Sequence, residues 1–191
     1  MMEAIVVSEF GEPEVLQLQK IPLPDIGIGG GAGDDDVMIK VSAVGVNPVD
    51  TYIRSGQYRN SPALPYTPGK DGAGIVYRIG NNIKHLKIGD RVYFLGSSSG
   101  SYAQYAICPS KYVYLLPDEI TFEQGACLGT PAFTAYRALF DKGHATPGER
   151  LLIHGASGGV GLMVVEMAKA IGVIVIGTAG TAEGIEVSSL L

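Results

Sequence analysis

The chain has 191 residues, and its 14 lysines and arginines against 19 aspartates and glutamates give a formal net charge of −5. This balance excludes a basic nucleic-acid binder that works through its overall electrostatic field. Hydrophobic residues make up 46% of the chain and charged residues 17%, which excludes an intrinsically disordered chain and provides for a hydrophobic core. The length allows one large or two small domains.

The cysteines and the N-terminus predict the cellular compartment. Cys108 and Cys127 cannot form a disulfide framework, a four-thiolate zinc site or a CxxC pair. The N-terminal MMEAIVVSEF has no basic flank, so we expect a strand and not a targeting peptide. The longest uncharged stretch, Val92–Ser110, contains GSSSGS, which a membrane-spanning helix would not carry. We therefore expect a cytoplasmic protein.

From Met1 to about Pro117 the sequence consists of short β-rich runs separated by turns. Many short strands at fairly regular spacing predict a small antiparallel barrel or sandwich. One short helix is expected around Val49–Arg54. The glycine-rich and acidic segment Asp25–Asp36 is expected to be a solvated hairpin tip. The predicted strands are AIVVSEF, VLQLQ, VMIKVSAVGV, AGIVYRIG, DRVYFLG, YAQYAI and YVYLLP.

After Pro117 the apolar spacing becomes helical. Thr121–Asp141 is predicted to be a helix with a break near Gly129–Pro131. Two continuous apolar strands joined by a helix then predict a parallel βαβ unit, buried on both faces. Its elements are a strand at Leu151–His154, a glycine turn, a helix at Val160–Ile171 and a strand at Val173–Ile176.

The glycine turn has the pattern G-x-x-G-x-x-G at Gly155, Gly158 and Gly161, directly between a predicted strand and a predicted helix. The last two glycines correspond to those of the dinucleotide fingerprint G-x-G-x-x-G, and Ala156 takes the first place. Such a turn brings the backbone close to a pyrophosphate at a helix N-terminus, and nothing bulky is expected to fit at Gly158. The alternative is a turn that only packs a helix on a sheet.

The end of the second strand bears on the choice between nicotinamide cofactors. An acid at this place normally hydrogen-bonds the ribose 2′-hydroxyl of NAD. Here the sequence is Gly177-Thr178-Ala179-Gly180-Thr181, so a 2′-phosphate is not repelled, which favours NADPH over NADH. No lysine or arginine lies nearby in the sequence, and Glu183 is the nearest charged residue.

Six stretches of the sequence resemble the zinc-free quinone oxidoreductases, of the zeta-crystallin type, in the medium-chain dehydrogenase/reductase superfamily. The resemblance implies an α/β fold with an all-β part. Residues 1–120 would form a GroES-like antiparallel β-barrel domain, and residues 121–191 would begin a Rossmann NADPH-binding domain that is truncated at its C-terminus. The stretches are VGVNPVDTYIRSGQY, LPYTPGKDGAGIV, GDRVYF, GTPAFTAYRAL, HGASGGVGL and IGTAGT.

Zinc-dependent relatives carry a cysteine ligand and a Gly-His-Glu sequence in the first domain. The corresponding places here read Gly45-Val46-Asn47 and Gly69-Lys70-Asp71, so no metal site is expected. The three histidines also lie in no metal-ligand spacing with either cysteine. His154, at the end of an apolar strand, is expected to be packed and hydrogen-bonded and not to act as a base.

The resemblance implies an NADPH-dependent reductase of quinones or related conjugated carbonyls. An amide and two phenols at the active site can hydrogen-bond a carbonyl and present apolar surface to a planar ring. By similarity these are Asn47, Tyr52 and Tyr58. Asn47-Pro48 could equally be a helix cap and first turn, and each tyrosine an ordinary half-buried aromatic. The cofactor-binding residues implied by similarity are Tyr52, Thr130, Thr134, Ser157, Gly158, Gly159, Val160 and Gly180.

Other functions stay open at this stage. A 2-enoyl or alkenal reductase has the same fold and cofactor. The family also includes a lens structural protein that binds AU-rich RNA, although no basic cluster supports RNA contact here. The chain could also be an inactive fragment. Family members are often homo-oligomers, but the segment that carries the oligomer edge is missing here. With it missing, the two apolar strands Leu151–His154 and Val173–Ile176 are expected to stay half uncovered.

Overall fold

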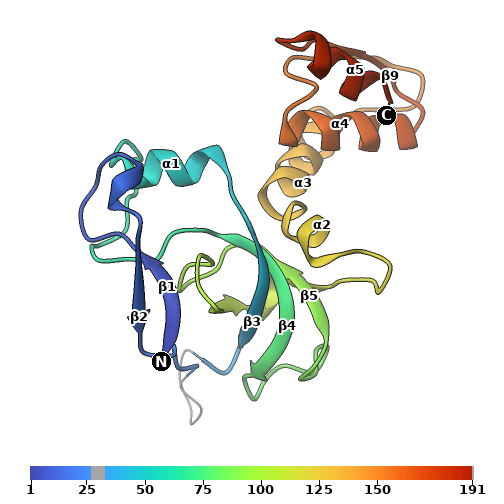
Figure 1. Ribbon diagram of the computed structural model, residues 1–191. Coiled ribbons are helices and arrows are strands. Elements are labelled where there is room, and N and C mark those ends of the chain that lie inside the picture. The colour runs from blue at the N-terminus through green and yellow to red at the C-terminus, as the bar shows by residue number, and fades with distance from the viewer. Residues whose placement is uncertain (27–32, 191) are drawn as a thin grey trace. The chain divides into compact units, whose positions relative to one another are not determined.

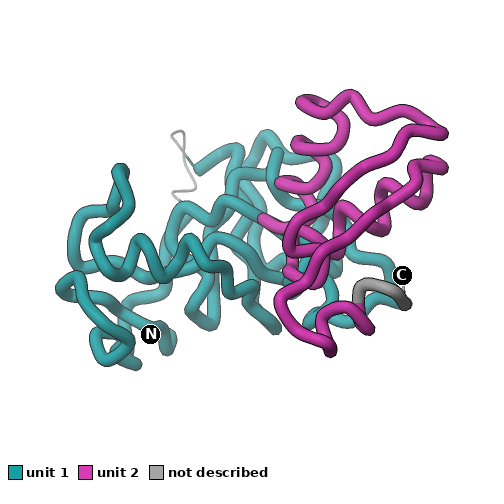
Figure 2. Tube along the Cα trace, turned by 90° about the horizontal axis from the view of Figure 1, so that it is seen from above, with its two compact units in different colours: residues 1–129 teal, residues 130–191 magenta. Residues whose placement is uncertain are grey.

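In the computed structural model, which describes residues 1–26 and 33–190, the chain forms two units, residues 1–129 and 130–191 (Figure 2). Each unit has β-sheet of its own and is described by itself. The domain boundary near residue 120 stays a prediction. No helix in the described ranges is long and apolar enough to cross a membrane.

The first unit contains two antiparallel sheets (Figure 1). The small one pairs β1 (Met2–Val6) with β2 (Gln17–Ile21). The larger has the order β6-β3-β4-β5-β7, and among the described residues its edge strands β6 and β7 do not pair with each other. The predicted antiparallel fold is therefore confirmed, but the sheet is not closed into a barrel. The large sheet consists of β3 (Asp36–Gly45), β4 (Asp71–Ile79), β5 (Arg91–Phe94), β6 (Tyr105–Pro109) and β7 (Val113–Leu115).

Alternating residues of the large sheet form the main core of the first unit. Successive side chains of a strand point to opposite faces, so residues two apart share one face. Val37 and Ile39 on β3 and Val92 and Phe94 on β5 follow this spacing and are fully buried. Val76 on β4 joins them in one cluster. The short strands predicted from the sequence therefore form this sheet.

Arg91 attaches the segment after β7 to β5. Its guanidinium lies over the Phe122 ring, 4.2 Å from the ring centroid. Its Nε lies 3.5 Å from an Asp118 carboxylate oxygen, and its Nη2 donates a hydrogen bond to the Ile120 carbonyl. Three different contacts from one side chain therefore fix the course of residues 117–122.

Helices follow where helical spacing was predicted. The expected helix over residues 121–141 consists of α2 (Phe122–Ala126), α3 (Gly129–Tyr136) and a π-helical turn at Arg137–Lys142. Thr121 caps α2, because its hydroxyl accepts a hydrogen bond from the Gln124 N–H while the Gln124 side chain accepts one from the Thr121 N–H. The break falls at residues 127–128, just before its predicted place.

The second unit is a parallel βαβ arrangement followed by a further helix. Strands β8 (Arg150–Ile153) and β9 (Ile174–Gly177) are parallel, and α4 (Gly159–Ala170) connects them. One sheet face packs against α4 through residues such as Ile153 and Val165. On the other face Leu152, Ile174 and Ile176 are each more than half exposed. The predicted parallel βαβ unit is therefore confirmed, whereas the predicted burial of its strands on both faces is wrong, and the strands are half uncovered as also expected. Helix α5 (Ala182–Leu190) follows them.

Two local predictions have different outcomes. His154 lies just after β8 and is exposed, so the prediction that it is packed is wrong. Its Nδ1 does form a hydrogen bond, 3.2 Å from the Thr178 hydroxyl. Residues 27–32 of the predicted hairpin tip lie outside the described residues. After them, the Asp36 N–H donates to the Gly33 carbonyl at 3.2 Å and closes a turn.

Candidate functional site

Asn47 is the N-cap of helix α1 (Pro48–Arg54), which follows β3 directly (Figure 1). Its backbone is extended, with φ −119° and ψ 151°, and Pro48 occupies the first turn, where a missing N–H costs nothing. The Asp50 carboxylate, three residues on, accepts a hydrogen bond from the Asn47 N–H at 2.9 Å. The capping interpretation of Asn47-Pro48 is therefore confirmed, and its active-site role stays a prediction.

The side chain of Asn47 belongs to a buried polar cluster. Its Nδ2 donates to the Asp71 Oδ2 at 2.8 Å, and Asn47 is only 6% exposed and Asp71 0% exposed. Nearby, the Tyr102 hydroxyl donates to the same Asp50 oxygen at 3.2 Å. Two carboxylates therefore contact Asn47, one through its side chain and one through its backbone.

Burial controls the protonation of this cluster. Burial raises the pKa of Asp50, with a smaller contribution from the charge of Asp71, while hydrogen bonds from Asn47 and Tyr102 and the charge of Lys70 oppose the rise. Burial also raises the pKa of the Tyr102 phenol, and the negative Asp50 adds to this. Tyr102 is therefore a neutral hydrogen-bond donor at physiological pH.

Asp50, Asp71 and Tyr102 are not among the site residues predicted from the sequence. Two signals could have identified the acids. Asp50 stands at the third position after an Asn-Pro helix start, where a capping carboxylate is favoured. Asp71 heads an apolar strand, where an acid needs a buried partner. Nothing in the sequence indicates Tyr102.

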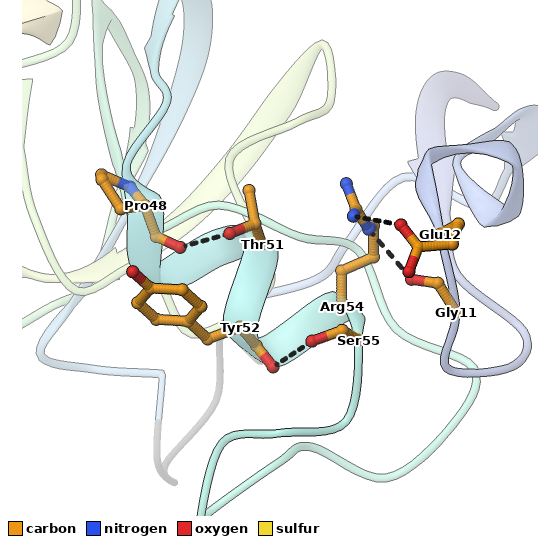
Figure 3. A network of polar contacts seen from close by, with 7 residues as sticks. All are labelled: Gly11, Glu12, Pro48, Thr51, Tyr52, Arg54 and Ser55. Atoms are coloured by element: carbon orange, nitrogen blue, oxygen red, sulfur yellow. Dashed lines mark hydrogen bonds and ion pairs between the residues drawn. The ribbon is translucent and has the colours of Figure 1, made fainter.

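Tyr52 is on the exposed side of α1. Figure 3 shows its ring extending back toward Pro48, with its hydroxyl in none of the dashed contacts. The C-terminal end of α1 is anchored by Arg54, whose Nε donates to the Gly11 carbonyl at 3.1 Å. Tyr52 is 52% exposed and Tyr58, just after the helix, is 44% exposed. Both rings are therefore accessible on an anchored segment.

The glycine turn of the second unit connects β8 to α4 and is tied to the end of β9. The Ala156 N–H donates to the Thr178 carbonyl at 2.8 Å, and the Gly158 N–H donates to the Gly155 carbonyl at 3.0 Å. Gly158 is the N-cap of α4, so helix geometry leaves the N–H groups of Gly159 and the two residues after it without an intrahelical acceptor. An anion can accept hydrogen bonds from such groups.

The three glycines of the motif are required for different reasons. A Cβ at Gly161 would lie 2.2 Å from the Gly155 carbonyl oxygen, so the turn has no room for one. Gly155 has a φ of +67°, which L side chains rarely adopt. A Cβ at Gly158 would meet only the Gly155 oxygen, at 3.4 Å, an ordinary contact. The tight position within the protein is therefore Gly161, and the expectation for Gly158, which concerns the approach of a bound pyrophosphate, stays a prediction.

The remaining predicted cofactor residues lie on α3, in and just after the turn, and in the segment after β9. Thr130 and Thr134 are four apart on α3 and so share a helix face. A Cβ on Gly159 would lie 3.8 Å from Pro131, so α3 passes beside the turn. Their cofactor roles stay predictions. Ser157 is partly exposed with its hydroxyl near Gly184, Val160 is exposed, and Gly180 has open space where a Cβ would be.

The sequence directly after β9 contains no acidic residue. The next acid along the chain, Glu183, interacts with its own helix terminus. It lies in the first turn of α5, where hydrogen bonds from its own backbone N–H and from the Thr181 hydroxyl lower its pKa. The Thr181 hydroxyl also accepts a hydrogen bond from the Gly184 N–H at 3.0 Å. Glu183 thus supports the helix start.

The places of the absent zinc ligands hold a different polar arrangement. Asn47 bonds Asp71, and the Lys70 Nζ donates to the Ser97 carbonyl at 2.9 Å. Within residues 1–26 and 33–190, no group of three or more His, Cys, Asp or Glu side chains could hold a metal ion.

Comparison with known proteins gives consistent relatives. The family model Alcohol dehydrogenase GroES-like domain matches residues 33–118. The quinone oxidoreductase of Pongo abelii is 51% identical over 187 residues, 96% of this chain and 54% of that protein. The chain thus spans about half the length of the curated relatives it matches.

Solved structures agree in fold. The quinone oxidoreductase of Pseudomonas syringae pv. Tomato DC3000 has a TM-score of 0.89 at 34% identity, covering 100% of this chain and 57% of that one. The Escherichia coli quinone oxidoreductase complexed with NADPH has a TM-score of 0.85 at 36% identity, covering 99% and 55%.

Proposed function

Because the chain belongs to the zinc-free quinone oxidoreductases of the medium-chain dehydrogenase/reductase superfamily, we propose that it is an NADPH-dependent oxidoreductase that reduces quinones. The observation that carries this proposal is the glycine turn between β8 and α4, in a parallel βαβ unit whose structural relative binds NADPH. The site residues, the cofactor and the substrate are parts of this proposal.

The second unit would hold the cofactor through its backbone. The N–H groups at the start of α4 would bind the pyrophosphate, and the absence of side chains at Gly158 and Gly159 would let it approach closely. Ser157, Val160, Gly180, Thr130 and Thr134 would line the rest of the cofactor site. Helix geometry leaves these donors without an intrahelical acceptor, and a Cβ at Gly158 or Gly159 would make only ordinary contacts, so these residues fit a dinucleotide.

NADPH is favoured over NADH because the sequence after β9 lacks a carboxylate that would repel a 2′-phosphate. Glu183, the nearest acid in the sequence, is engaged at the start of α5 with the Thr181 hydroxyl.

The first unit would bind the acceptor. Reduction of a quinone to a hydroquinone takes a hydride, which NADPH supplies when bound, and a proton. Asn47 can donate a side-chain N–H to the carbonyl oxygen on which negative charge develops. The exposed phenols of Tyr52 and Tyr58 can donate a second hydrogen bond and present ring faces to a planar substrate. Positioning and electrostatic stabilisation would supply the catalysis.

An NADPH fluorescence titration on the monodisperse full chain tests the proposal. We expect saturable binding that is weaker for NADH and is lost in Gly158→Val, a change that the protein's own atoms accommodate. Ala170→Val, an exposed change at the far end of α4, should bind as the wild type does. Absence of NADPH binding by the folded wild type would overturn the proposal.

The substrate is tested next. NADPH oxidation with 9,10-phenanthrenequinone should be faster than with an enal, and the opposite order would assign the chain to the 2-enoyl reductases. Asn47→Ala should slow turnover while leaving the affinity for NADPH unchanged.

A further inference from the structure

Asp71 is a buried carboxylate that the proposed chemistry does not yet use. It has no exposed surface, and its Oδ2 accepts a hydrogen bond of 2.8 Å from the Asn47 Nδ2. Hydrogen bonds to a carboxylate acceptor in a buried place are strong. The pair is therefore a specific feature of the first unit.

The position of the Asp71 side chain is fixed by two glycines. A Cβ on Gly129 would lie 2.6 Å from the Asp71 Cγ and 2.9 Å from its Oδ2. A Cβ on Gly45 would lie 2.8 Å from the Asp71 Cβ. Neither glycine could therefore carry a side chain without displacing Asp71, and their backbone packs closely beside it.

Asn47 is restrained from its backbone as well. The Asp50 carboxylate accepts the Asn47 N–H at 2.9 Å, and the same oxygen accepts the Tyr102 hydroxyl at 3.2 Å. The main chain of Asn47 is therefore fixed at the helix start. The side-chain amide could still rotate, and the hydrogen bond to Asp71 restrains this rotation.

An asparagine amide can turn by 180° and exchange its oxygen for its nitrogen, but a carboxylate only accepts hydrogen bonds. An ionised Asp71 therefore requires the Nδ2 side to face it. We propose that Asp71 is a positioning residue that fixes the amide of Asn47, so that its second N–H is presented for donation. The direction of this N–H toward a substrate carbonyl rests on the proposed function, whereas the fixed amide does not.

Nuclear magnetic resonance of the full chain tests the fixed amide directly. We expect the two Asn47 Hδ2 protons, assigned by their loss in Asn47→Ala, to give separate signals. At least one should exchange with solvent about tenfold or more slowly than those of exposed Asn81, as expected for a buried charge-assisted bond. Fast exchange in the wild type would overturn the proposal.

Asp71→Asn is the matched variant, because it keeps the shape of the side chain but offers a donor as well as an acceptor. We expect its Asn47 Hδ2 protons to exchange about tenfold faster, while the methyl signals of Val37 and Ile39 stay unchanged. Asp36→Asn, on β3, should leave the Asn47 signals unchanged. Unaltered Asn47 exchange in a folded Asp71→Asn would contradict the proposal.

Turnover separates this proposal from the proposed function. Where the wild type reduces a quinone, Asp71→Asn should lower kcat about tenfold without changing the affinity for NADPH, because a misplaced donor weakens only the interaction with the reacting carbonyl. An unchanged kcat would overturn the positioning role. A wild type that binds no NADPH would contradict the proposed function. The exchange rates of the Asn47 side-chain amide would then be the test of the role of Asp71.

Discussion

The two units bury their sheets in different ways. In the first unit five antiparallel strands form one sheet, and the residues of its main core, such as Val37 and Phe94, have no exposed surface. In the second unit two parallel strands are covered by α4 on one face, and Leu152 on the other face is 54% exposed. Antiparallel strands can be joined by short turns, whereas parallel strands depend on separate elements for each face.

The same difference recurs in the candidate site residues. The first unit uses side chains, Asn47 with Asp50 and Asp71, whose position depends on burial and on hydrogen bonds. The second uses backbone N–H groups, whose position depends on the absence of a Cβ at Gly161. A site made of side chains is sensitive to charge and pH, and a site made of backbone is sensitive to side-chain size.

The largest predicted effect compares the two sheets. Phe94→Ala removes a fully buried ring and should lower the free energy of unfolding of the first unit by about 3–5 kcal/mol. Leu152→Ala should lower that of the second unit by less than about 1 kcal/mol, because more than half of the side chain is exposed. Urea unfolding followed by residue-resolved hydrogen exchange measures both. Equal losses would show that Leu152 is covered in solution.

The next effect concerns the glycine turn. Gly161→Ala places a Cβ against the Gly155 carbonyl and should destabilise the second unit by about 2 kcal/mol. Gly180→Ala meets nothing within 4 Å and should leave the stability nearly unchanged. Thermal unfolding monitored by circular dichroism compares the two. A tolerated Gly161→Ala would mean that the turn can relax.

A smaller effect is the pH dependence of the first unit. Burial raises the pKa of Asp50 in the folded state, so the folded state binds its proton more readily than the unfolded state does. Its destabilising contribution is therefore present above the raised pKa and disappears as the pH falls toward the ordinary value of 3.8. Asp50→Asn lacks this titration, so the wild type should gain stability relative to it on acidification. Urea midpoints of both proteins at several pH values between 4 and 7 measure this, and parallel curves would contradict it.

The last prediction concerns the order in which the two units unfold in urea and uses the two cysteines as probes. Burial raises the pKa of the Cys108 thiol on β6 to about 12, whereas Cys127 is exposed. In native buffer a thiol reagent should therefore label Cys127 at least about a hundredfold faster. In rising urea, amide protection in α4 should be lost before Cys108 becomes reactive. In Cys127→Ser, early labelling of Cys108 would instead mean that the first unit opens first.

Much of the fold follows from apolar periodicity. Short β-rich runs between turns predicted the strands of the first unit, and continuous apolar runs predicted the parallel pair β8–β9. Barrel closure was not predictable in the same way, because it depends on whether β6 meets β7, a pairing between edges that no local pattern encodes. His154 was misplaced because strand β8 ends one residue earlier than the apolar run suggests.

The part of the candidate site that is formed by backbone groups was predictable, because the glycine motif marks it in the sequence. The glycine motif located the turn, but it did not indicate that Gly161 has no room for a Cβ, since the close approach of Gly161 to the Gly155 oxygen is a tertiary distance. The capping role of Asn47 was one of two sequence interpretations. Its partner Asp71 is 24 residues away, and only the folding of β4 beside β3 brings them together.

The three contacts of Arg91 have a consequence for how related sequences can diverge. The partner Asp118 is 93% exposed, and an exposed ion pair contributes little, so position 118 is free to drift. Lysine at position 91 could keep an ion pair but not the flat stacking on Phe122 together with the bond to the Ile120 carbonyl. In related sequences, substitutions at positions 91 and 122 are therefore expected to occur together, because these two residues connect β5 to α2.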